Sequence, residues 1–124
     1  MKTVPALISV VDDDESVRES LPDLLRECGY AVDAFASAEA FLASGSTGQT
    51  RCLILDIAMP GMSGPELKEE LKRRGHDIPV IFITARSDDA LRGRLLAQGA
   101  AGCLFKPFSE SDLLDSLHAA LSMR

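Results

Sequence analysis

The chain has 124 residues, and 13 Lys and Arg residues against 19 Asp and Glu residues give it a formal net charge of −6 at pH 7. This length fits one compact domain with one substantial core. A hydrophobic fraction of 46% and a charged fraction of 26% are ordinary globular values, which excludes a disordered tail or a fibrous repeat. No apolar run approaches the roughly 18 residues of a membrane span, no secretory signal is evident, and the acidic balance argues against direct binding of nucleic acid.

The three cysteines show no metal-site or redox pattern. Cys28, Cys52 and Cys103 are widely spaced among apolar neighbours, with no Cys-x-x-Cys pair. We expect all three to be small buried hydrophobic residues in a reducing, cytoplasmic environment. His76 and His118 lie far apart in the sequence, so a histidine metal site is not expected.

Five short apolar runs alternate with longer segments of helical period. Three of the runs are nearly continuous in apolar residues, which is typical of central strands covered on both faces. The second run alternates more, which favours a position nearer the edge of a sheet. The expected strands are Leu7–Val11, Ala31–Phe35, Cys52–Leu55, Pro79–Ile83 and Gly102–Phe105.

The intervening segments carry helix start and stop signals. Pro22 interrupts the first helical pattern and predicts a kink, and Gly93 weakens the fourth, so we expect that helix to be the loosest. Strands alternating with helices predict a parallel sheet with right-handed crossovers in a single α/β domain. The expected helices run from Asp14 to Gly29, Ser37 to Gly45, Ser63 to Gly75, and Asp88 to Gln98, with the last beginning after Ser109.

Polar residues gather where these runs end. Asp12, Asp13 and Asp14 follow the first run, Asp56 the third, Thr84 the fourth, and Lys106 with Pro107 the fifth. Each has an ordinary explanation alone, and Asp14 is expected to cap a helix. Together they are specific, because ligands of open parallel sheets bind beyond the carboxyl ends of the strands.

The chemistry of this set is restrictive. Two carboxylates about 4 Å apart repel by roughly 4 kcal/mol at an effective dielectric near 20. Such a cluster must take up a proton or hold a hard cation, and oxygen ligands favour Mg²⁺ or Ca²⁺. A nearby lysine and hydroxyl complete a cradle for a phosphoryl group, and a carboxylate can accept phosphate as an acyl phosphate. Asp56 is the expected nucleophile.

Four stretches carry a family resemblance over essentially the whole chain, residues 1–124. The chain resembles a response-regulator receiver domain of two-component signalling. Its sequence in Ser37–Leu42 is most similar to the nitrogen-fixation (FixJ-like) subgroup. The resemblance implies a doubly wound (βα)5 flavodoxin-like fold with a parallel sheet in the order 2-1-3-4-5. The motifs are Val11–Asp14, Leu55–Gly64, Ile83–Ala85 and Phe105–Phe108.

The resemblance also implies roles at the acidic cluster. Asp56 would be phosphorylated by a partner histidine kinase in a reaction that needs Mg²⁺. Asp56 and Asp13 would bind the ion, Asp12 would help through water, and the backbone carbonyl of Ala58 would be a further ligand.

Other roles fall on the later strands. Lys106 would neutralise phosphoryl charge, and its peptide bond to Pro107 would be cis. Thr84 and Phe105 would be the switch residues. In the family that the chain resembles, two positions tend to tune the lifetime of the phosphate, and here they are Ala58 and Arg86. Small Ala58 would leave the attacking water little obstruction, and Arg86 would shield the phosphoryl group.

The same resemblance implies partners beyond the kinase. The output would be an effector domain of the same protein, absent from this chain, or a separate downstream protein. A homodimer formed on phosphorylation through the fourth helix and fifth strand is a further expectation. The domain would not be an enzyme beyond its own phosphorylation and dephosphorylation.

Three alternative functions remain open from the sequence. A magnesium-dependent phosphatase of the haloacid-dehalogenase type would use Asp12, Asp14, Thr84 and Lys106, but its further acidic motif should follow the lysine. A flavodoxin-like flavin carrier needs a phosphate loop where the aspartate triplet stands. A receiver that docks partners without phosphorylation is the third.

Overall fold

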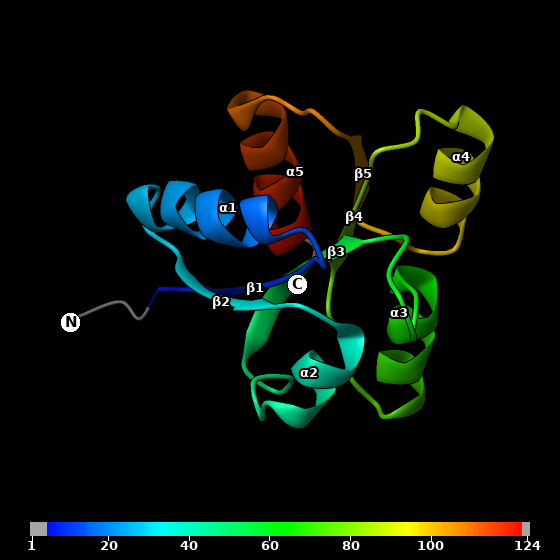
Figure 1. Ribbon diagram of the computed structural model, residues 1–124, viewed down its shortest axis with the longest axis horizontal. Coiled ribbons are helices and arrows are strands. Elements are labelled where there is room, and N and C mark those ends of the chain that lie inside the picture. The colour runs from blue at the N-terminus through cyan, green and yellow to red at the C-terminus, as the bar shows by residue number, and fades with distance from the viewer. Residues whose placement is uncertain (1–4, 123–124) are drawn as a thin grey trace.

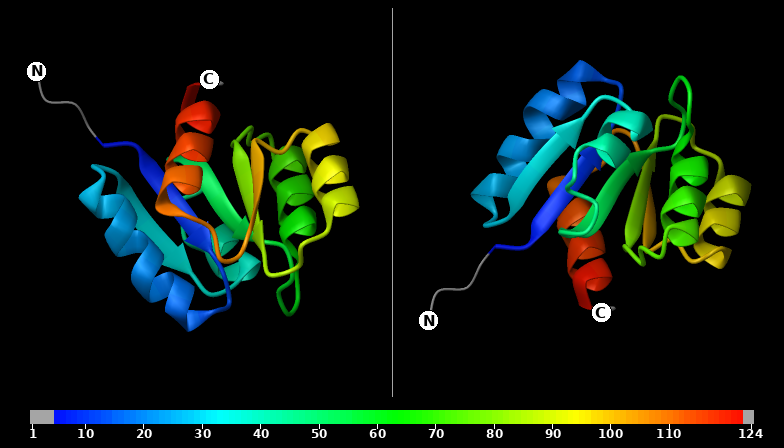
Figure 2. Two further views of the ribbon diagram at one scale, coloured as in Figure 1. Left: turned by 90° about the horizontal axis from the view of Figure 1, so that it is seen from above. Right: turned by 90° about the horizontal axis from the view of Figure 1, so that it is seen from below.

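The computed structural model describes residues 5–122 and shows five parallel strands in the order β2-β1-β3-β4-β5 (Figure 1). This confirms the expected doubly wound α/β fold. All strands point the same way, so their carboxyl ends share one edge of the sheet (Figure 2). The elements are β1 (Leu7–Val11), α1 (Glu15–Glu27), β2 (Ala31–Phe35), α2 (Ala38–Ala43), β3 (Thr50–Asp56), α3 (Gly64–Arg73), β4 (Val80–Thr84), α4 (Asp89–Ala97), β5 (Gly102–Phe105) and α5 (Glu110–Ser122).

Two strands differ from the expected bounds. Strand β3 begins at Thr50 rather than Cys52 and extends to Asp56, while β4 begins and ends one residue later than expected. Thr50 is polar and so lies outside the apolar run, yet it is buried and its Oγ1 lies 2.7 Å from Oγ of Ser9 on β1. Asp56 belongs to the strand because it pairs with Ile83 in the ladder.

The helices begin where the capping residues predict. A side-chain oxygen at the start of each helix accepts a hydrogen bond from a backbone N–H of the first turn, which satisfies a donor without a helical partner. In α3 the arrangement is a complete capping box. The capping residues are Asp14, Ser37, Ser63, Asp88 and Ser109.

Helix α1 departs from expectation at its end. Cys28 is the C-cap residue and is exposed, so the prediction of three buried cysteines is wrong there, whereas Cys52 and Cys103 are buried. Cys28 follows the last residue of the helix, and the chain leaves the helix at this point. Pro22 lies inside the helix and is buried.

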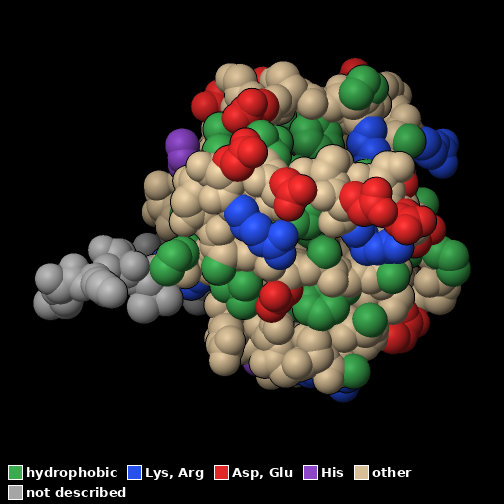
Figure 3. Space-filling view, turned by 60° about the vertical axis from the view of Figure 1, so that its left-hand side comes forward, with side chains coloured by type: hydrophobic (Ala, Val, Ile, Leu, Met, Phe, Trp, Pro, Cys, Tyr) green, Lys and Arg blue, Asp and Glu red, His purple; other side chains and the backbone are tan. Residues whose placement is uncertain are grey.

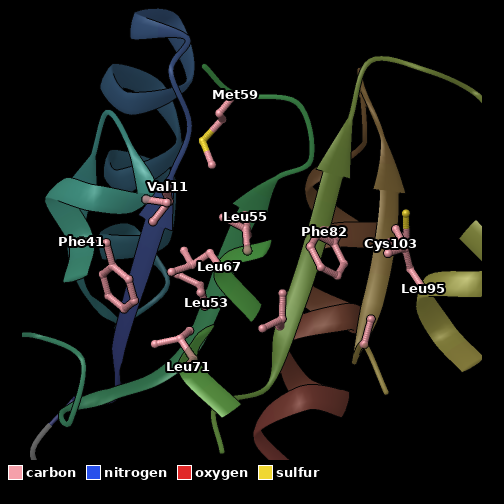
Figure 4. Close-up of a cluster of buried hydrophobic side chains, with 13 residues drawn as sticks. Val11, Phe41, Leu53, Leu55, Met59, Leu67, Leu71, Phe82, Leu95 and Cys103 are labelled. Carbon is pink, nitrogen blue, oxygen red and sulfur yellow. The ribbon is translucent and has the colours of Figure 1, made fainter. Parts of the chain in front are cut away.

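The sheet separates two apolar clusters. The first packs α2, α3 and α4 against one face and includes Phe41, Leu67 and Phe82 (Figure 4). The second packs α1 and α5 against the other face and includes Leu25 and Leu117. Since both faces are covered, the middle of β3 (Cys52–Leu55) and most of β4 (Val80–Ile83) are continuously apolar.

Helix α4 contributes least to these clusters. Leu95 is its buried residue, and Leu96 is 41% exposed. A side chain at Gly93 would meet open space. Its C-terminal end is also tied to α3, because Nζ of Lys68 donates to the carbonyl oxygen of Gln98 at 3.1 Å.

The surface carries charges of both signs. Acidic and basic side chains are mixed on the face shown in Figure 3. Among residues 5–122, no helix has the length and apolar character needed to cross a membrane.

Candidate functional site

Three carboxylates meet at the carboxyl edge of the sheet. Asp12 follows β1 and Asp56 ends β3, and these central strands are hydrogen-bonded neighbours. One oxygen from each of Asp12, Asp13 and Asp56 lies within 4.8 Å of the others. Asp12 is fully buried, Asp56 is 7% exposed and Asp13 faces solvent. The cluster is thus buried on one side and open to a ligand on the other.

This crowding perturbs the acid at the end of β3. Burial, together with the charge of Asp12, raises the pKa of Asp56 from 3.8 to about 7, although the charge of Lys106 acts in the opposite direction. Without a cation, Asp56 would therefore be only partly ionised at neutral pH. A bound cation would replace the proton on Asp56, because it offsets the same repulsion.

Asp12 is held from three sides. Its Oδ2 accepts from Nζ of Lys106 at 2.8 Å, and its Oδ1 accepts from the backbone N–H of Asp14 at 2.9 Å. Its carbonyl oxygen accepts from Nη1 of Arg18 on α1 at 3.0 Å. The first two bonds fix the orientation of the buried carboxylate and satisfy its oxygens, and the bond from Arg18 holds the backbone of Asp12.

Lys106 is placed by β5 and β4. Its backbone N–H donates to the carbonyl oxygen of Thr84 at 2.7 Å, and its peptide bond to Pro107 is cis. Burial lowers the pKa of the Lys106 ammonium, but its hydrogen bond to Asp12 and the charges of Asp12 and Asp56 outweigh burial, so the pKa is raised overall. Lys106 is thus a permanent positive charge beside the acidic cluster.

A pocket of about 290 Å³ opens beside Asp56. Thr84 is buried at its wall, and Oγ1 of Thr84 accepts from the backbone N–H of Arg86 at 3.1 Å. The pocket brings together most residues that the sequence singled out. They are Asp13, Asp56, Ala58, Thr84, Arg86 and Lys106.

Phe105 lies outside this pocket. It is half-buried and lines a neighbouring hollow of about 620 Å³ together with Pro107. The guanidinium carbon of Arg92, on α4, lies 5.4 Å from the centre of the Phe105 ring, in a cation–π contact. The expected switch aromatic is therefore covered by α4 in this conformation.

The backbone of Gly64, at the start of α3, lies close to the backbone of Asp56 and Ile57. The N–H of Gly64 donates to the carbonyl oxygen of Ile57 at 2.9 Å. A Cβ atom on Gly64 would lie 2.4 Å from the carbonyl oxygen of Asp56. Only glycine permits α3 to start so close to the acid.

Sequence reasoning did not single out several contributors to the site. Leu91 of α4 and Ile57 line the pocket, Arg18 and Arg92 contact Asp12 and Phe105, and Glu39 of α2 contacts the loop after β3. Arg18, Leu91 and Arg92 lie outside the motifs, while Ile57 and Glu39 lie in stretches that carry the resemblance but were assigned no role. The contacts of Arg92 and Glu39 join separate elements, which no local sequence pattern shows.

The donor set fits a hard divalent cation. Carboxylate and carbonyl oxygens at the end of a sheet, with one side open, match the preference of Mg²⁺ for a few protein oxygens and several waters or phosphate oxygens. Nitrogen and sulfur ligands of softer metals are not part of the cluster.

Comparison with known proteins gives the same family by sequence. The profile described as the response regulator receiver domain matches residues 8–118. Nodulation protein W of Bradyrhizobium diazoefficiens is 44% identical over 115 residues, which cover 93% of this chain and 51% of that protein. The transcriptional regulatory protein FixJ of Azorhizobium caulinodans is 41% identical over 114 residues, which cover 92% and 54%. The response regulator protein TodT of Pseudomonas putida is 39% identical over 118 residues, which cover 95% and 52%. The chain spans about half the length of these relatives.

Solved structures agree with the sequence comparison. A low-resolution structure of the response regulator StyR matches with a TM-score of 0.87 and 44% identity, covering 97% of this chain and 61% of that chain. A crystal structure of FixJ-N matches with a TM-score of 0.85 and 34% identity, covering 98% of both chains. These matches favour the receiver over the phosphatase and flavin-carrier alternatives. With the acidic cluster at the carboxyl edge of a 2-1-3-4-5 sheet, they show that this chain belongs to the response regulator receiver domain family, in its FixJ-like branch.

Proposed function

We propose that Asp56 accepts a phosphoryl group from the phosphohistidine of a sensor histidine kinase. The observation that carries the proposal is a nearly buried aspartate with its pKa raised to about 7, facing a pocket that also holds Asp13 and Lys106. An Oδ atom of Asp56 attacks phosphorus, the oxygen–phosphorus bond forms and the phosphorus–nitrogen bond breaks. The product is an acyl phosphate, and the phosphohistidine of the kinase, protonated on its other ring nitrogen, leaves as neutral imidazole with the electron pair of the broken bond.

The residues proposed to hold Mg²⁺ are Asp12, acting through water, Asp13, Asp56 and the carbonyl of Ala58. When bound, the ion would neutralise charge on the phosphoryl oxygens. Lys106 supplies a second positive charge at the same place. Asp12 keeps Lys106 oriented through their 2.8 Å contact.

Thr84 and Phe105 are the proposed switch residues. The hydroxyl of Thr84 turns to donate to the new phosphoryl oxygens, which add a charge of about −1.5 to −2. Phe105 then moves from beneath Arg92 into the space that Thr84 leaves. These movements change the surface formed by α4 and β5, which is how the site would reach its output.

The test is phosphorylation by a small-molecule donor. Wild-type protein incubated with acetyl phosphate and Mg²⁺ should gain the mass of one phosphoryl group, and Asp56→Asn should gain none. Omission of Mg²⁺, or Asp13→Asn, should strongly reduce labelling. Absence of labelling in wild type, or labelling of Asp56→Asn, would contradict the proposal, while sustained turnover of acetyl phosphate would indicate a phosphatase.

Arg86 is proposed to prolong the life of the acyl phosphate. It lines the pocket beside Asp56, and its backbone is fixed by Thr84. Its side chain can shield the phosphoryl group, whereas small Ala58 leaves the attacking water little obstruction. Arg86→Ala should therefore lose the label several-fold faster than wild type after the donor is removed, and an unchanged rate would exclude the shield.

The proposed partners follow from the relatives. The regulators that resemble this chain are about twice its length, so an effector domain of the same protein, or a separate protein, is the proposed recipient of the signal. A phosphorylation-dependent homodimer through α4 and β5 is proposed with it. The setting of such a relay would be the cytoplasm.

A further inference from the structure

The loop between β3 and α3, residues 57–63, contains a turn that needs an acceptor from elsewhere. Gly61 has φ +76° and follows Pro60, a sequence typical of a type II turn. In such a turn the N–H of the next residue commonly bonds back across the turn. Here the N–H of Met62 donates instead to Oε2 of Glu39, on α2, at 3.1 Å.

Glu39 lies close against this turn. A Cβ atom on Gly61 would be 2.7 Å from Oε2 of Glu39. Glycine is therefore needed at position 61 for its backbone angle and also for the approach of the carboxylate. The contact joins residues that are 23 positions apart.

The rest of the loop is anchored at two other points. Its base is closed by the bond from the N–H of Gly64 to the carbonyl oxygen of Ile57. Its middle is anchored by Met59, which is buried and reaches from the loop toward Val11 and Leu55 (Figure 4). The tip has Glu39.

Ala58 lies between these anchors. It is exposed and lines the pocket beside Asp56. The direction of the Ala58 carbonyl depends on the backbone on either side of it. The contacts at the base, middle and tip of the loop hold that backbone in place. Loss of the tip contact would allow the loop to turn about Met59 and would move the carbonyl of Ala58.

We propose that Glu39 is a positioning residue that holds the β3–α3 loop so that the carbonyl of Ala58 faces the cation site. The inference rests on the proposed function, since it assigns Ala58 to the cation. Glu39 does not touch the cation or the phosphoryl group. Its effect is to preorganise a backbone ligand, which lowers the cost of ordering the loop when the cation binds.

The experiment compares two substitutions with a matched control. Glu39→Gln keeps a side-chain oxygen that can accept from Met62, and Glu39→Ala removes it. Glu69→Ala removes the same charge from an exposed position on α3. Magnesium affinity, measured by isothermal titration calorimetry, should fall roughly three- to tenfold in Glu39→Ala, as expected for loss of one hydrogen bond. It should stay within about twofold of wild type in Glu39→Gln and Glu69→Ala.

A second readout needs no cation. Amide hydrogen exchange of Met62 in metal-free protein should be faster in Glu39→Ala than in wild type, while amides of β3 are unchanged. An equal Mg²⁺ affinity in wild type and Glu39→Ala would overturn the inference, even if the variant melted at a lower temperature, because the contact would then be structural only.

The failure of this inference differs from the failure of the proposed function. If wild-type protein binds no Mg²⁺ at all, the assignment of the cation site is wrong. If wild type binds Mg²⁺ and is labelled on Asp56, but Glu39→Ala does both equally well, only the role of Glu39 is wrong.

Discussion

Asp56 is a residue whose ionised form is needed for function but destabilises the folded domain, and Lys106 offsets part of that effect. A nearly buried carboxylate beside Asp12 costs free energy in the folded state, and its pKa is raised to about 7 as a result. Lys106 offsets part of that cost through Asp12. Receiver chemistry needs the negative charges, so the cation-free domain carries an electrostatic strain that a cation relieves.

Asp56→Asn should make the metal-free protein more stable at pH 8. The folded protein keeps a proton on Asp56 that the unfolded chain loses above its pKa of 3.8. The contribution of this group to the free energy of unfolding therefore falls as pH rises from about 4 to about 7 and stays low above that. We expect a gain of about 1 to 3 kcal/mol at pH 8 that shrinks toward zero near pH 4.

Urea denaturation at both pH values measures this gain. Mg²⁺ should raise the midpoint of the wild type and leave that of Asp56→Asn nearly unchanged. A variant no more stable than wild type at pH 8 would show that the acidic cluster is not strained.

Lys106→Met should destabilise the domain. It removes the countercharge of Asp12, which is fully buried. We expect a loss of about 2 to 4 kcal/mol in the free energy of unfolding, since an unpaired buried charge is left. The exposed substitution Lys72→Met is the control and should change stability by less than about 0.5 kcal/mol. Equal effects in guanidinium denaturation would refute a special role for the pair.

At the scale of elements, the start of α3 and the middle of α4 contain glycines with opposite requirements. Gly64 touches the backbone of Asp56, whereas Gly93 faces open space. Both lie in helices, where alanine is intrinsically better than glycine. The surroundings alone decide the sign of a substitution.

Gly64→Ala should destabilise the domain and Gly93→Ala should stabilise it. At position 64 the added methyl group would meet the carbonyl oxygen of Asp56 at 2.4 Å, so the helix start or the strand end must shift. We expect a loss of more than about 1 kcal/mol there and a gain of about 1 kcal/mol at position 93. Thermal unfolding of both variants beside wild type measures the difference. A stabilised Gly64→Ala would contradict the close approach.

The sequence predicted the elements that carry a regular signal. Apolar runs gave β1, β2 and β5 at their observed bounds, and side-chain caps gave the helix starts. Thr50 was missed because its burial depends on a hydrogen bond to Ser9, 41 residues away. Cys28 was misplaced because helical periodicity does not show where the helix ends, and Cys28 is its exposed C-cap residue.

The same distinction applies to the site. Asp12, Asp13 and Asp56 were predictable as neighbours because parallel strands end at one edge. The cover of Arg92 over Phe105 and the contact of Glu39 with Met62 were not, since each depends on how separate elements pack. Strand ends follow from topology, while contacts between helices and loops need three dimensions.

Over the whole molecule, stability is unevenly distributed. Strands β1, β3 and β4 lie in the middle of the sheet with helices on both faces, while α4 buries one residue and exposes Leu96. Segments with few buried apolar contacts open at the lowest cost in free energy. This makes α4 the element most easily moved by an event at Thr84 or Phe105.

Amides of α4 should exchange with solvent faster than those of the other long helices. We expect protection in α4 at least about tenfold below that in α3 and α5, which corresponds to a difference of about 1.4 kcal/mol in opening free energy. Hydrogen–deuterium exchange followed by NMR in metal-free protein measures this. Protection in α4 equal to that in α5 would show that its few contacts are sufficient.

The division of the interior by the sheet has a practical consequence for protein engineering. Among residues 5–122, the buried side chains under α1 and α5 form a cluster separate from that under α2, α3 and α4. Energetic effects of substitutions on opposite sides should therefore sum almost independently. A designer can rebuild the α1–α5 half for thermostability while the half containing α4 keeps the looseness that signalling requires.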